Sequence, residues 1–277
     1  MFATYLIGLR EGLEATLVVS ILIAFLVKSD RREKLKLVWA GVAAAIALSV
    51  LFGWLLNYTE TTLLKDFKQQ EAFEAVTSVA AVCFVTWMIF WMRRAARGIA
   101  GELRSKLQDA LEVGSFAVGF MAFLAVVREG LETSLIFYAA VQGADVNGGP
   151  LLALLGGVAT SIAIGYLMFA TAVRINLTVF FRWTGVLLIL VAAGIFKYGV
   201  HSLQEAEFLP GITHIAYDAA SILDPSTWYA TLLAGMFNIT AQPSVLELVA
   251  WAGYLVPVLV LFLVPARRTA PAPTPAA

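Results

Sequence analysis

Charged side chains are scarce in this sequence of 277 residues. Only 14% of the residues are Asp, Glu, Lys or Arg, whereas 60% are hydrophobic, and the mean hydropathy is +0.84. So few polar side chains cannot cover a soluble globule of this size. We therefore predict an all-α integral membrane protein whose apolar surface faces the lipid bilayer.

Cysteine and histidine are also rare. The single Cys83 cannot form a disulfide within the chain, and we interpret it as a small packing residue. Neither of the two histidines falls in a predicted membrane span, and there is no Glu-x-x-His motif, which argues against a haem or di-iron enzyme. We expect neither an enzyme nor a permanently bound cofactor.

Hydropathy predicts seven membrane-spanning helices, each near the ~20 residues that a helix needs to cross roughly 30 Å of hydrocarbon. They are expected at residues 4–27, 37–58, 73–92, 115–141, 151–173, 180–200 and 246–264. Residues 1–8 contain no Lys or Arg and so lack the basic start of a cleavable signal peptide. The first span is therefore expected to stay in place as an anchor.

Basic residues divide unevenly between the connections. They gather after the first, third, fifth and seventh spans, as Lys28, Arg31, Arg32, Lys34 and Lys36, then Arg93, Arg94, Arg97, Arg104 and Lys106, then Arg174 and Arg182, and finally Arg267 and Arg268. Residues 142–150 and 201–245, in the opposite connections, contain no Lys or Arg. The positive-inside rule then places the N-terminus outside and the C-terminus inside.

One charged motif occurs twice inside the predicted spans. Arg10-Glu11-Gly12-Leu13-Glu14, the first REGLE motif, returns as the second REGLE motif at residues 128–132. Each motif begins a set of three spans, and because three is odd the two sets enter the membrane from opposite sides. This arrangement predicts the inverted repeats of many secondary transporters, with a substrate site between the repeats near mid-depth.

The chain divides accordingly into five segments. Residues 1–112 and 113–200 are the predicted repeats, 201–245 an extracytoplasmic loop, 246–265 the seventh span and 266–277 a disordered cytoplasmic tail rich in Ala and Pro. Within the loop, residues 212–223 and 227–237 are apolar, which predicts one or two short helices at the outer interface. A solvated loop explains the same acidic stretch equally well.

Each motif sets its charges on one face of a helix. The Arg and the second Glu are four residues apart and the two Glu three apart, which places them on an arc about 100° wide. Gly12 and Gly130 would let neighbouring helices approach closely. Alternatively, Arg10 and Glu14 merely neutralise each other while Glu11 reaches to the outer interface. Each charge at mid-bilayer costs at least about 2.5 kcal/mol, however, so six of them favour a function.

The carboxylates predict a site for a hard cation. Oxygen ligands without Cys, His or Met suit Mg²⁺, Ca²⁺, Mn²⁺ or iron better than Cu(I). The predicted ligands are Glu11, Glu14, Glu129 and Glu132, with Arg10 and Arg128 as counter-ions. Their formal charges leave a net −2, which a divalent ion would neutralise.

These motifs resemble those of the oxidase-dependent iron transporters, the family of the high-affinity iron permeases. Residues 86–93, 204–206 and 215–218 are also similar to the bacterial ferrous iron permeases in that family. The resemblance implies iron import across the bacterial cytoplasmic (inner) membrane, with iron as the substrate and the four motif glutamates as its ligands. Fe²⁺ and Fe³⁺ are both compatible with it.

The resemblance also implies that acidic residues on the outer side pass iron inward. The candidates are Glu71 and Glu74, which share a helix face, and Glu205 and Asp218. An acidic helix N-terminus stabilised by the helix dipole explains Glu71 and Glu74 equally well. The implied partners are an extracytoplasmic iron-binding lipoprotein and a haem peroxidase, and no nucleic acid is expected.

Two other functions stay open. A proton-coupled exchanger or exporter of another cation would use the same glutamates as proton carriers. A structural membrane subunit would transport nothing. Metal binding and iron uptake by the purified protein distinguish these possibilities from an iron permease.

Overall fold

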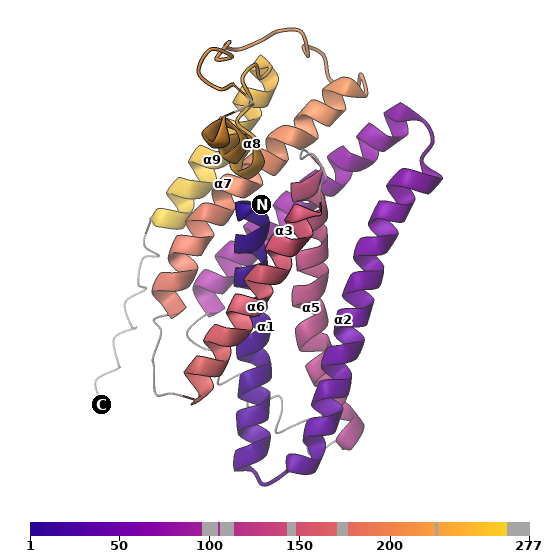
Figure 1. Ribbon diagram of the computed structural model, residues 1–277, viewed down its shortest axis with the longest axis vertical. Coiled ribbons are helices and arrows are strands. Elements are labelled where there is room, and N and C mark those ends of the chain that lie inside the picture. The colour runs from indigo at the N-terminus through magenta and orange to yellow at the C-terminus, as the bar shows by residue number, and fades with distance from the viewer. Residues whose placement is uncertain (96–104, 106–113, 143–147, 171–176, 225–226, 265–277) are drawn as a thin grey trace, which may run out of the picture.

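The computed structural model describes residues 1–95, 105, 114–142, 148–170, 177–224 and 227–264, and in this part of the chain the regular elements are all helices. The long helices are α1 (Phe2–Lys28), α2 (Leu35–Tyr58), α3 (Phe67–Ala95), α5 (Ser115–Val141), α6 (Gly149–Ala170), α7 (Leu177–Glu205) and α9 (Val245–Leu263) (Figure 1). The short helix α8 (Trp228–Phe237) lies in the connection before α9. The predicted all-α fold is confirmed.

Five of these helices, α2, α3, α6, α7 and α9, are long and apolar enough to cross a membrane. Helices α1 and α5 are as long, with 27 residues each, but they carry the REGLE charges. Large apolar side chains such as Trp39, Leu152 and Val256 face outward. An outward apolar surface of this kind is typical of an integral membrane protein, and the seven-span topology stays a prediction.

The most extensive packing contacts join α1 to α6, α2 to α5 and α3 to α7. Helix α1 runs parallel to α6, with Gly8 against the backbone of Leu154 and Gly12 against Ser161. Helix α5 runs parallel to α2 in the same way, with Gly130 against Ser49. The close approach predicted for both motif glycines is confirmed. Each motif helix thus packs on the second helix of the other predicted repeat.

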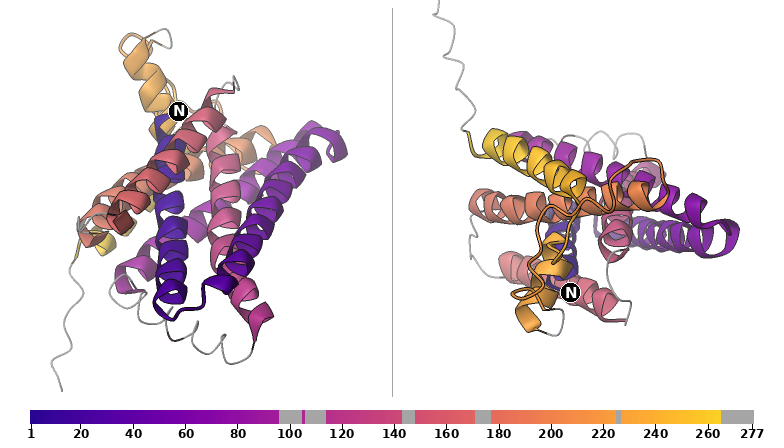
Figure 2. Two further views of the ribbon diagram at one scale, coloured as in Figure 1. Left: turned by 60° about the horizontal axis from the view of Figure 1, so that its bottom comes forward. Right: turned by 90° about the horizontal axis from the view of Figure 1, so that it is seen from above.

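Helix α9 lies along α7 at one side of the bundle (Figure 2). It begins with an N-cap, in which the Ser244 hydroxyl accepts a hydrogen bond from the Glu247 amide at 3.1 Å. Because Ser244 also donates to the Gln204 side chain at 2.8 Å, the start of α9 is fixed against the end of α7. We call this end of the molecule, where α1 also begins, the outer end, following the predicted orientation.

Two predicted boundaries were wrong. Helix α7 continues to Glu205, so His201 lies within this apolar helix and not in the loop. The added turn is stabilised by an i, i+4 contact, in which His201 Nε2 lies 3.3 Å from Glu205 Oε1. Helix α3 begins at Phe67, which places Glu71 and Glu74 inside it. In the described part of the outer loop one short helix forms, at residues 228–237, which agrees with the predicted one or two. Residues 212–223 form turns held by backbone hydrogen bonds, including those to Pro243 and Ala241.

Some predictions fall outside the described part of the chain. They concern the basic residues Arg97, Arg104, Lys106, Arg174, Arg267 and Arg268, and the tail at 266–277.

Candidate functional site

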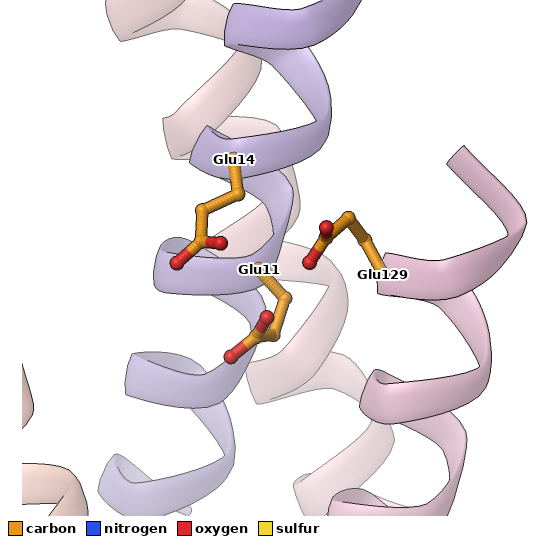
Figure 3. Close-up of side chains that lie close together, drawn as sticks. All are labelled: Glu11, Glu14 and Glu129. Atoms are coloured by element: carbon orange, nitrogen blue, oxygen red, sulfur yellow. The ribbon is translucent and has the colours of Figure 1, made fainter. Parts of the chain in front are cut away.

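The two REGLE motifs meet between α1 and α5. One carboxylate oxygen from each of Glu11, Glu14 and Glu129 lies within 4.8 Å of the other two. Figure 3 shows Glu129 reaching from α5 toward the two carboxylates on α1. The three residues are 1%, 6% and 7% exposed. Oxygens gathered this closely in the interior can converge on a single cation.

Arg10 pairs with both carboxylates of its own motif. Its Nη1 lies 3.0 Å from Glu11 Oε1, and its Nη2 lies 3.2 Å from Glu14 Oε1. Nη1 also donates to the sulfur of Met88 on α3 at 3.3 Å. Glu11 is therefore buried and paired, and the alternative in which it reaches to the outer interface is wrong.

Arg128 behaves differently although its motif has the same sequence. Its Nε lies 2.9 Å from Glu132 Oε1, and its guanidinium stacks over the rings of Trp91 at 4.2 Å and Trp87 at 5.0 Å. Among the described residues Glu129 forms no ion pair. The structure thus brings three of the four predicted ligands together and leaves Glu132 paired with its arginine.

Several buried oxygens at this site have no hydrogen-bond partner within the described part of the chain. They are Glu11 Oε2, Glu14 Oε1, Glu129 Oε2 and Glu132 Oε2, of which Glu14 Oε1 has only its ion-pair contact with Arg10. An unpaired carboxylate oxygen in the interior is costly, because it has lost water without gaining a donor. A bound cation would supply the missing partner, so the arrangement fits a cation site.

A second acidic group lies at the outer end. Glu71 and Glu74 are buried on α3, and Glu74 accepts a hydrogen bond from the Tyr198 hydroxyl on α7. Glu205 lies close enough to Glu71 for their carboxyl groups to interact. The first turn of α3 contains no acidic residue, so the helix dipole does not explain Glu71 and Glu74.

Sequence reasoning missed Glu60, which joins this outer group. Glu60 lies in a π-helical turn, Thr59–Leu63, at the end of α2, and its carboxyl group interacts with that of Glu74. The Tyr138 hydroxyl donates to it, and Gln142 Nε2 lies 3.1 Å away. In the sequence, Glu60 could be noticed only as a carboxylate in the predicted outer connection between the second and third spans.

Asp218 makes its hydrogen bonds within the outer loop. Its carboxylate accepts from the backbone amide of Ala220 at 2.9 Å and from Gln242 Nε2 at 2.9 Å. Both donors lower the pKa of Asp218, and the Ala220 amide has the larger effect. Both contacts stabilise a turn, and Asp218 is exposed.

A buried ion pair that the sequence reasoning also missed connects α7, α9 and the outer loop. Lys197 Nζ lies 3.3 Å from Glu247 Oε2 and donates to the Asn238 carbonyl at 2.6 Å and to Thr240 Oγ1 at 2.7 Å. Glu247 Oε1 lies 3.0 Å from His201 Nδ1. The available signal was a lysine inside a span that is otherwise almost free of charge.

Ionisable groups buried between helices that are long enough to cross a bilayer are characteristic of membrane transport proteins. Comparison with known proteins agrees with this class and narrows it. The chain belongs to the iron permease FTR1 family, which it matches over residues 1–270. It is therefore a membrane transporter and not an enzyme, and the resemblance inferred from the two motifs is confirmed.

Two relatives show how far the similarity extends. The chain is 38% identical over 275 residues to the ferrous iron permease EfeU of Escherichia coli O6:H1, covering 98% of this chain and 99% of the relative. It is 37% identical over 273 residues to the ferrous iron permease EfeU of Yersinia pestis, covering 98% of this chain and 96% of the relative. No solved structure matches this chain.

Proposed function

We propose that this protein imports iron through the carboxylate site between its two REGLE motifs. The observation that carries the proposal is the convergence of Glu11, Glu14 and Glu129 from two helices, with buried oxygens that have no donor. Membership of an iron permease family supports iron as the cation. The acidic group at the outer end would collect the ion before it reaches this site.

Charge favours Fe²⁺ over Fe³⁺ as the ion that crosses. Four motif glutamates and two arginines carry a net formal charge of −2, so a divalent ion makes the site neutral and a trivalent ion leaves an excess charge. The relatives are named as ferrous iron permeases, which agrees with this choice. A 100 mV inside-negative potential gives a dication about 4.6 kcal/mol, enough for roughly three decades of accumulation.

The pairing of helices favours a route through alternating access. Helices α1 with α6, and α2 with α5, form two tightly packed pairs, and the cation site lies where α1 meets α5. We propose that the two pairs, each made of one helix from each predicted repeat, rock against each other about the site, as helix bundles do in other transporters. The proposed location of the protein is the inner membrane of a bacterium, and its proposed partners are an extracytoplasmic iron-binding lipoprotein and a haem peroxidase.

Uptake by proteoliposomes tests the proposal. Wild-type protein should accumulate Fe²⁺ under an inside-negative potential, and Glu129→Gln should abolish uptake. Glu33→Gln, at an exposed acidic residue between α1 and α2, is the matched control and should transport normally. Normal uptake by Glu129→Gln would reject the shared site. Proton flux without iron uptake would favour the rival proton-coupled exchanger.

A further inference from the structure

One short segment of α3 contacts the arginines of both motifs. The Met88 sulfur accepts a hydrogen bond from Arg10, and the rings of Trp87 and Trp91 lie under the guanidinium of Arg128. The two rings stack on each other, with centroids 6.3 Å apart and planes 25° apart. A cation within about 6 Å of a tryptophan face is attracted by the ring, and Arg is well suited to such stacking.

The two motifs make different ion pairs although their sequences are identical. Arg10 forms ion pairs with both carboxylates of its motif. Of the two carboxylates in the second motif, Arg128 pairs with Glu132 and not with Glu129. The motif sequence cannot cause this difference, so the surroundings must. The clearest difference lies on α3, which offers a thioether to one arginine and two aromatic faces to the other.

We propose that Trp87 and Trp91 are positioning residues of the cation site, which hold Arg128 beside Glu132 and away from Glu129. This inference rests on the proposed function and adds two residues to its site. The free Glu129 carboxylate then completes the cluster with Glu11 and Glu14. When the ion also draws on Glu132, the ring faces still hold the guanidinium, so Arg128 does not compete with the ion.

The role predicts a specific kinetic change. In Trp91→Leu, Arg128 is free to pair with Glu129, so the KM for Fe²⁺ should rise on the order of tenfold, a size between those expected for exposed and for desolvated cation–π contacts, because the Arg128 side chain is partly buried. The kcat should stay within about twofold, and Trp91→Phe should give an intermediate KM because Phe is a weaker partner. The control is Trp39→Leu, an exposed tryptophan on α2, which should leave KM unchanged.

A double-mutant cycle separates positioning from general packing. If Trp91 acts through Arg128, Trp91→Leu should change KM in the wild type but not in an Arg128→Met background. Equal and additive effects in both backgrounds would overturn the inference, while leaving the proposed function intact as long as the wild type carries iron.

A measurement on metal-free protein keeps the inference testable if the wild type does not carry iron. The emission attributable to Trp91 is the difference between the fluorescence spectra of the wild type and of Trp91→Phe. This difference spectrum should shift when Arg128→Met removes the guanidinium from the ring. An unchanged difference spectrum would show that the stack is absent and would overturn the positioning role.

Discussion

Replacing Gly130 by Ala should destabilise the protein more than replacing Gly12 by Ala. A β-carbon at Gly130 would lie 2.0 Å from Ser49 Oγ and 2.8 Å from Ser49 Cβ. A β-carbon at Gly12 would lie 2.4 Å from Ser161 Oγ but 3.2 Å from Ser161 Cβ. Rotation of a serine side chain moves its hydroxyl and leaves its Cβ in place, so only the contact at Gly12 can be relieved by rotation.

The two contacts therefore differ in cost. In Gly12→Ala the Ser161 hydroxyl turns away and loses its 2.7 Å hydrogen bond to the Val158 carbonyl, a loss of about 1 kcal/mol. In Gly130→Ala the backbones of α2 and α5 must separate, and overpacking of this kind costs about 1–3 kcal/mol. The separation also moves Glu129, which α5 carries, away from the cluster.

Second-site changes test this reasoning. Ser161→Ala should cost little further stability in Gly12→Ala, because the hydrogen bond of the hydroxyl is already lost there and the remaining Cβ contact is 3.2 Å. Ser49→Ala should not restore the stability of Gly130→Ala, because the 2.8 Å contact with Ser49 Cβ remains. Ser49→Gly removes that Cβ and should restore the stability, apart from the ~1 kcal/mol that Gly costs in a helix. The control is Gly253→Ala on α9, where no atom of the described residues lies within 4 Å of the added carbon.

The assay is the Tm of purified protein in detergent, with iron uptake measured on the same variants. Equal losses of Tm in the two alanine variants would refute the argument. So would full rescue of Gly130→Ala by Ser49→Ala, because that would show that the hydroxyl alone makes the contact.

Three further predictions concern groups outside the central cluster. Lys197→Met leaves Glu247 buried without its lysine, which should lower the free energy of unfolding by about 3–5 kcal/mol and therefore lower the Tm. The double variant Lys197→Met, Glu247→Leu should regain part of the lost Tm. Glu60→Gln should raise the KM for Fe²⁺ uptake in proteoliposomes with little change in kcat, because it weakens collection of the ion and leaves the REGLE site intact; an unchanged KM would remove Glu60 from the pathway. Asp218 has a pKa lowered from 3.8 by its two donors, so its carboxylate stabilises the loop above that pH, and this contribution is lost as the pH falls through the lowered pKa. The protection factors of the amide hydrogens in residues 216–223, which correct the exchange rates for their intrinsic dependence on pH, should therefore fall on acidification in the wild type. In Asp218→Asn they should already be low at neutral pH and change little with pH.

The sequence alone determined the helical membrane fold, the positions of the long helices within a few residues, the two motifs and the family. These features are local, because hydropathy over about 20 residues and the spacing of charges on one helix do not depend on neighbouring elements. The ends of α3 and α7 were misplaced because polar residues continue both helices where partners on other elements are available.

Tertiary structure decided which charged side chains pair with each other. Two identical motifs form different ion pairs, because Met88 lies beside Arg10 while Trp87 and Trp91 lie beside Arg128. The same holds for Lys197 and Glu247, which are far apart along the chain and share no sequence pattern. The strength of an ion pair or an aromatic contact depends on side chains from other helices, and a sequence read along one helix does not contain that information.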